Sequence, residues 1–98
     1  MTEQIETHRV HVWVQGRVQG VGFRAYVMQN ALPIGVTGWV RNVGYDAVEA
    51  IAEGTKEQIE EFLRMVKRGP IGSRVDESHE EWEQVTGEFG SFRVKASM

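Results

Sequence analysis

The sequence predicts an α+β domain in which two helices cover one face of a mainly antiparallel sheet. Three observations predict it. Alternating apolar and polar residues at 9–15 are typical of a half-buried strand. Turn residues at 42–46 separate two further strand-like runs, and residues 55–68 show the apolar spacing of an amphipathic helix. A chain of 98 residues fits a single domain.

The first strand is expected over Arg9–Gln15, because Val10, Val12 and Val14 occupy every second position and so share one face. The glycine-rich stretch GRVQGVGFR follows at residues 16–24. Its three glycines predict a loop, since glycine favours turns and backbone conformations with positive φ.

The first helix is predicted over Phe23–Leu32, where apolar residues recur at helical spacing instead of alternating. We expect Pro33 and Gly35 to end this helix, because proline has no N–H group and glycine is a common helix stop. The repeating apolar residues, expected in the core, are Phe23, Val27 and Ala31.

A β-hairpin is predicted next in the chain. Val36–Val43 and Ala47–Glu53 both have strand character, and the sequence NVGYD at Asn42–Asp46 has the composition of a turn. The two strands are therefore expected to pair antiparallel.

The second helix begins with Thr55 and Gln58, which have the spacing of a capping box. Glutamates lie early in the helix and basic residues lie late, as the helix dipole favours. Gly69 and Pro70 end it. The apolar stripe expected to face the core consists of Ile59, Phe62, Leu63 and Val66.

The highly acidic segment Val75–Val85 is predicted to be an edge strand, because charged side chains discourage edge-to-edge pairing. A short last strand is expected at Phe92–Ala96. The order βαββαβ, with this short C-terminal strand, predicts a ferredoxin-like sandwich. In that topology the first two strands are parallel and separated by the third. The loop at 16–24 and the end of the second strand, at Arg41 and Asn42, should therefore meet.

The composition excludes several kinds of site. The chain has no cysteine, so no disulfide, thiolate nucleophile or zinc–thiolate centre can form. The net charge of −3 argues against binding nucleic acid through its phosphates. No apolar run approaches the length of a membrane span. These features predict a cytoplasmic protein with no nucleic-acid or membrane partner, and the acidic edge strand favours a monomer.

The histidines give little indication of a site. His8 and His11 point to opposite faces of a strand, which makes them a poor metal pair, and we expect surface positions for both. His79 lies in the acidic strand and is expected to be solvated. Trp13 and Trp39 are expected on the helix-free face or at an edge of the sheet.

The glycine loop has the features of an anion site. Glycines at 20 and 22 let the backbone come close to a ligand, and the loop runs into a helix N-terminus, where free N–H groups favour anions. Arg24 adds a guanidinium suited to phosphate. The alternative is a plain turn with a solvent-facing arginine. The G-K-[ST] of a P-loop is absent, and the match to a dinucleotide fingerprint lacks the required parallel sheet.

The stretch GRVQGVGFR closely resembles the signature of the acylphosphatase family. A second block, IGVTGWVRN at residues 34–42, is similar to another conserved motif of that family. The resemblance covers residues 8–96, which leaves residues 1–7 as a flexible N-terminal arm before an acylphosphatase-like domain at 8–98. One difference lies in the hairpin, where the family commonly has Asp-Gly and this chain places Gly44 earlier.

The resemblance implies hydrolysis of the carboxyl–phosphate bond of acyl phosphates. It implies that Arg24 binds phosphate, that Asn42 orients the attacking water, and that no metal or organic cofactor takes part. The implied partner is a small acyl phosphate. The residues of the implied phosphate-binding loop are Val18, Gln19, Gly20, Val21, Gly22 and Phe23.

Two other functions remain open from the residues. A non-catalytic module that senses a phosphorylated metabolite would need Arg24 but no positioned water. Nucleic-acid binding through the open sheet face is disfavoured by the acidic balance of the chain. For acyl phosphate hydrolysis, the carboxylate leaving group is a weak base and needs no general acid, so positioning and charge stabilisation suffice.

Overall fold

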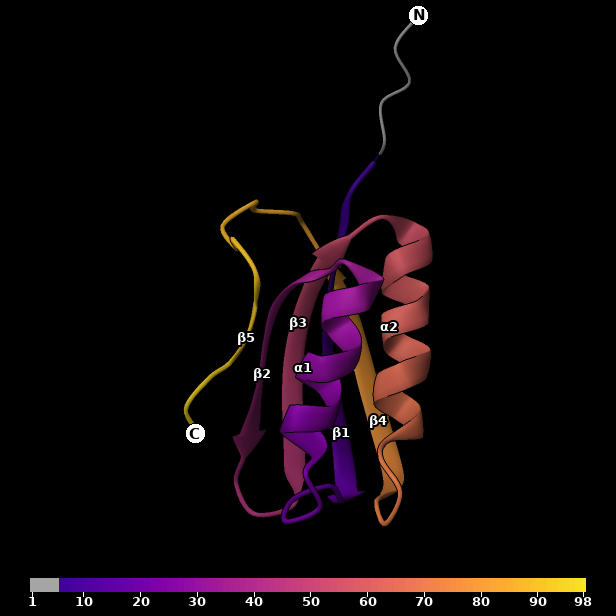
Figure 1. Ribbon diagram of the computed structural model, residues 1–98, viewed down its shortest axis with the longest axis vertical. Coiled ribbons are helices and arrows are strands. Elements are labelled where there is room, and N and C mark those ends of the chain that lie inside the picture. The colour runs from indigo at the N-terminus through magenta and orange to yellow at the C-terminus, as the bar shows by residue number, and fades with distance from the viewer. Residues whose placement is uncertain (1–5) are drawn as a thin grey trace, which may run out of the picture.

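The computed structural model describes residues 6–98 of the chain. Its elements are β1 (His8–Arg17), α1 (Phe23–Ile34), β2 (Thr37–Val43), β3 (Ala47–Gly54), α2 (Lys56–Arg68), β4 (Arg74–Glu83) and β5 (Phe92–Val94). This order confirms the predicted βαββαβ arrangement with a short terminal strand (Figure 1). Of the predicted N-terminal arm, residues 1–5 lie outside the described residues.

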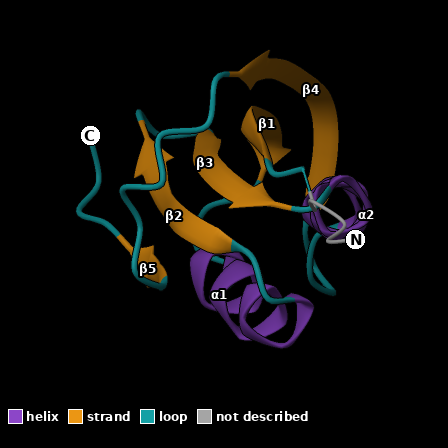
Figure 2. Cartoon of the chain, turned by 90° about the horizontal axis from the view of Figure 1, so that it is seen from above, coloured by secondary structure: helices purple, strands orange, loops and turns teal. Residues whose placement is uncertain are grey.

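The sheet has the strand order β4-β1-β3-β2-β5. Neighbouring strands are antiparallel except for β2 and β5, which are parallel. Both helices lie on the same side of the sheet (Figure 2). The acidic strand β4 is at an edge, as predicted, although it ends at Glu83 instead of Val85. Because β1 and β2 both run antiparallel to the intervening β3, their C-terminal ends share one end of the sheet.

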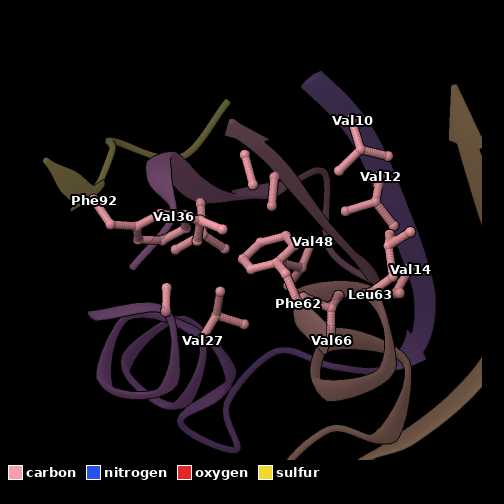
Figure 3. Packing of buried hydrophobic residues seen from close by; sticks show 14 of the residues in the cluster. Val10, Val12, Val14, Val27, Val36, Val48, Phe62, Leu63, Val66 and Phe92 are labelled. Atoms are coloured by element: carbon pink, nitrogen blue, oxygen red, sulfur yellow. The ribbon is translucent and has the colours of Figure 1, made fainter. Parts of the chain in front are cut away.

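The core lies between the sheet and the two helices (Figure 3). The alternate valines of β1 at positions 10, 12 and 14 are fully buried, and the predicted apolar stripe of α2 packs against them. From α1, Phe23 and Val27 are buried, while Tyr26 is partly buried and donates its hydroxyl hydrogen to the Met65 carbonyl at 2.8 Å. This packing fixes which face of each strand meets the helices.

The two helices differ in how well their ends were predicted. The capping box of α2 is present, since Gln58 N donates to Thr55 Oγ1 at 3.2 Å and Thr55 N donates to Gln58 Oε1 at 2.9 Å. The prediction that Pro33 ends α1 is wrong, because α1 continues to Ile34 and stops at Gly35. A proline this near the end disturbs only the final turn, so the helix can continue to its left-handed glycine cap.

Glu53 is a charged residue almost buried on the helix-free face, with 6% of its surface exposed. Its Oε2 accepts hydrogen bonds from Arg9 Nη1 and Thr86 N, both at 3.0 Å, and its Oε1 accepts one from Gly87 N at 3.1 Å. Burial alone would raise the pKa of Glu53, but these hydrogen bonds outweigh burial and lower it. Glu53 thereby anchors the segment that leads from β4 to β5.

The prediction that His11 is a surface residue is wrong. Its Nε2 contacts Glu49 Oε2 and its Nδ1 lies 3.1 Å from Glu83 Oε2, so only 17% of the side chain is exposed. Trp13 stacks on its ring, with centroids 3.8 Å apart. The strand pattern of β1 could not show this, because both carboxylates come from neighbouring strands. His79 is exposed, as predicted.

Replacing Glu53 with glutamine should lower the free energy of unfolding at neutral pH by about 1–3 kcal/mol, because buried donors lose a charged acceptor. A carboxylate whose pKa is lowered on folding stabilises the protein above its ordinary pKa of 4.5. That stabilisation is lost as the pH falls through the lower folded-state value. Urea unfolding at several pH values should therefore show a weaker acid dependence in Glu53→Gln. The exposed Glu60→Gln on α2 is the control, and equal behaviour of the two variants would contradict this role.

Candidate active site

The glycine loop after β1 adopts the backbone conformation that its composition predicts. Gly20 has a φ of 73° and Gly22 a φ of 74°, values in the left-handed region that favours glycine. A Cβ atom built on either glycine would meet no protein atom within 4 Å. The left-handed backbone conformation therefore explains why positions 20 and 22 are glycines, whereas crowding by protein atoms does not. The space beside the loop is open to a ligand.

The loop ends at a helix N-terminus with unpaired amides. Gly22 is the N-cap of α1 and provides no side-chain cap. Across residues 6–98, the backbone N–H groups of residues 19–24 donate no hydrogen bond to another protein group. Such free amides, together with the positive end of the helix dipole, favour an anion at this position.

A pocket of about 380 Å³ brings the predicted site residues together. Its walls include the loop at 18–20 together with Gly22 and Phe23, and also Arg24 from α1 and Asn42 from β2. The predicted convergence of the loop with the end of β2 is thus confirmed. Val21 is the one residue of the predicted loop that does not line the pocket, and it packs against the core instead.

The Arg24 and Asn42 side chains are both half-buried and available to a ligand. In the described part of the chain, no hydrogen bond or ion pair engages either the guanidinium or the carboxamide. Arg41 differs, because its Nε donates to Glu49 Oε1 at 2.6 Å on the helix-free face. This contact holds the Arg41 side chain on the face of the sheet opposite the pocket.

Gln19 forms hydrogen bonds with a distant part of the chain that the sequence did not indicate. Its Nε2 donates to the carbonyl oxygens of Val43 at 3.3 Å, Gly44 at 3.1 Å and Ala47 at 2.9 Å. The side chain therefore ties the glycine loop to the hairpin that follows Asn42. No periodicity or local motif signals such a contact, because its acceptors are main-chain atoms of a distant turn.

The C-terminal segment fixes the backbone of Asn42. Met98 N donates to the Asn42 carbonyl at 2.9 Å, and Gly44 N donates to the Met98 carbonyl at 3.0 Å. Gly44 has a φ of 61°, a left-handed conformation that glycine adopts readily because it has no Cβ atom. The hairpin that differs from the family pattern is therefore held by main-chain contacts, while the Asn42 carboxamide stays free.

A larger pocket, of about 630 Å³, lies between the two helices. Arg64 and Arg68 line it, but Glu61 does as well, and it includes no residue of the glycine loop. We assign the site to the smaller pocket, since unpaired amides and an unpaired guanidinium meet only there among the pockets described.

A family model gives the family of the chain directly. The acylphosphatase model matches residues 10–94, which is most of the chain. The chain belongs to the acylphosphatase family. The resemblance found in the sequence motifs is thereby confirmed, and the matched region contains the whole glycine loop and Asn42.

Individual acylphosphatases agree with this assignment. The chain is 47% identical over 87 residues to an acylphosphatase of Syntrophotalea carbinolica, covering 89% of this chain and 95% of that protein. It is 43% identical over 86 residues to one of Pelotomaculum thermopropionicum, covering 88% and 94%. The crystal structure of acylphosphatase from Bacillus subtilis matches with a TM-score of 0.85 and 32% identity, covering 90% of this chain and 98% of that one.

Proposed function

We propose that the protein hydrolyses acyl phosphates to a carboxylate and inorganic phosphate in the pocket formed by residues 18–24 and Asn42. Membership of the acylphosphatase family supports the reaction class. One observation supports the roles proposed for Arg24 and Asn42. The two residues come from different elements and line one pocket with unpaired side chains.

The phosphoryl group binds at the loop and the start of α1. Free amides of residues 19–24 donate to its oxygens, and the Arg24 guanidinium supplies a planar, charge-assisted pair of hydrogen bonds. The same groups stabilise the charge that the phosphoryl oxygens carry in the transition state. Arg24 therefore contributes to substrate binding and to catalysis from the same position.

Asn42 orients the attacking water. Its carboxamide oxygen accepts a hydrogen bond from the water and aims the water at phosphorus, opposite the leaving oxygen. A neutral amide is too weak a base to remove the proton at neutral pH. The proton passes instead to a phosphoryl oxygen of the substrate as the bond to phosphorus forms.

The leaving group needs no proton from the protein. The bond between phosphorus and the acyl oxygen breaks to release a carboxylate, which is stable without protonation at neutral pH. Among residues 6–98, no carboxylate or imidazole side chain lines the pocket. The pocket therefore suits acyl phosphates and not phosphate monoesters, whose alkoxide leaving groups need an acid.

We further propose that the protein acts as a monomer in the cytoplasm on a small-molecule substrate. The exposed carboxylates of β4 disfavour pairing of sheet edges between copies. A chain without cysteine suits a reducing compartment. Within residues 6–98, neither helix has the length and apolar character needed to cross a bilayer.

Phosphate release from a panel of substrates tests the proposed function. Benzoyl phosphate and acetyl phosphate should be hydrolysed, and glycerol 3-phosphate, an alkyl monoester, should not react above background. A metal chelator should leave the rates unchanged, because the proposed steps use only side chains and amides. If phosphate inhibited or bound but no acyl phosphate turned over, the protein would be a sensor. Comparable rates with the monoester would contradict the leaving-group argument.

A further inference from the structure

The pocket extends beyond the phosphate-binding end to two apolar side chains, Met28 and Val94. Met28 follows Arg24 by four residues, or about one helical turn, on α1, about 6 Å further from the loop. Val94 pairs with Val40, two residues before Asn42 on β2, about 6.6 Å further from the loop. Since α1 runs away from the loop and β2 runs toward it, both displacements have the same direction (Figure 1).

The extended end of the pocket carries no charge. Of the residues that the structure describes, Arg24 is the only charged one in the lining, and Ala25, Met28 and Val94 are all apolar. Val94 is 41% exposed, although it is a large hydrophobic residue. A second anionic group on a substrate would find no cation there, whereas an apolar group would cover exposed apolar surface.

In-line attack places the acyl group at this end. If Asn42 holds the water on the side of the sheet, the leaving oxygen lies across phosphorus, on the side of α1. Ala25 and Met28 belong to that side of the pocket, and Val94 borders it from β5, which contacts α1. Methionine is flexible and polarizable, so Met28 can pack against acyl groups of different shape.

We propose that Met28 and Val94 form an acyl subsite that selects acyl phosphates with uncharged, apolar acyl groups over those with a second phosphate. This inference rests on the proposed function, because it assigns the other end of the same substrate. Met28 and Val94 are specificity residues and do not take part in bond breaking.

Near-isosteric polar variants test the subsite. Met28→Gln and Val94→Thr keep shape and change polarity, and each should lower kcat/KM for benzoyl phosphate by about 3- to 10-fold. The loss for the smaller acetyl phosphate should stay below about twofold, and inhibition by inorganic phosphate should not change. Leu32→Gln is the matched control, because Leu32 is exposed one turn further along α1 and does not line the pocket.

A charge-introducing variant tests the selection itself. Met28→Lys should raise kcat/KM for 3-phosphoglyceroyl phosphate relative to benzoyl phosphate by about tenfold or more, since it supplies the missing cation. Equal changes for all substrates, or an equal effect of Leu32→Gln, would overturn the acyl subsite while leaving the hydrolytic function intact. Absence of turnover of every acyl phosphate by the unaltered protein would instead refute the proposed function.

Discussion

Replacing Arg24 with alanine should abolish hydrolysis of acyl phosphates and binding of phosphate together. The guanidinium is the only charged group that lines the pocket in the described part of the chain. Its removal leaves the loop amides alone against a multiply charged phosphoryl group. We expect kcat/KM to fall by about a thousandfold or more, as the loss of transition-state charge stabilisation at a polar site usually gives at least this effect. Steady-state kinetics and inhibition by inorganic phosphate measure both consequences.

Two further variants make the Arg24 experiment specific. Arg24→Lys keeps the charge but loses the planar, bidentate pair of N–H donors, so it should retain only part of the activity. Arg17→Ala removes an exposed arginine at the end of β1 that does not line the pocket, and it should leave kcat/KM nearly unchanged. Undiminished phosphate inhibition in Arg24→Ala would show that the anion binds elsewhere.

Replacing Asn42 with alanine should separate turnover from binding. The carboxamide has no partner within the described residues and is proposed to touch only the water. We therefore expect kcat to fall by about a hundredfold or more, and the inhibition constant for phosphate to change by less than about threefold. A regulatory module would show phosphate binding that is indifferent to this substitution, but it would have no turnover to lose.

A matched asparagine serves as control for this substitution. Asn30 lies on α1 outside the pocket, where its Nδ2 donates to the Tyr26 carbonyl at 2.7 Å. Asn30→Ala should cost some stability but leave kcat unchanged. Full activity of Asn42→Ala would show that the water needs no carboxamide. A parallel loss of phosphate binding would mean that Asn42 shapes the pocket instead.

Much of the fold could be predicted because its signals are local. The alternate valines of β1 define one buried face, and the capping box at Thr55 and Gln58 marks the start of α2. The charge of β4 predicted its place at an edge. The end of α1 was predicted wrongly at Pro33, because a proline in the last turn destabilises a helix less than one in the helix interior.

The meeting of Arg24 and Asn42 could be predicted because it follows from topology. Two parallel strands on either side of β3 must end together, whatever their side chains. The contacts of Gln19 with the hairpin and of Met98 with Asn42 could not be predicted. Their acceptors are main-chain oxygen atoms far away in the sequence, and such acceptors leave no residue-type pattern. His11 was misplaced for the same reason, since its partners belong to other strands.

The central claim is that the pocket holds the phosphoryl group and directs water onto phosphorus. Hydrolysis of benzoyl phosphate in water labelled with a heavy oxygen isotope tests this claim most directly, with mass spectrometry of both products. Our account predicts that the label enters inorganic phosphate and is absent from benzoate. Label in benzoate would show attack at the carbonyl carbon, and that result would contradict the roles given to Arg24, the loop amides and Asn42.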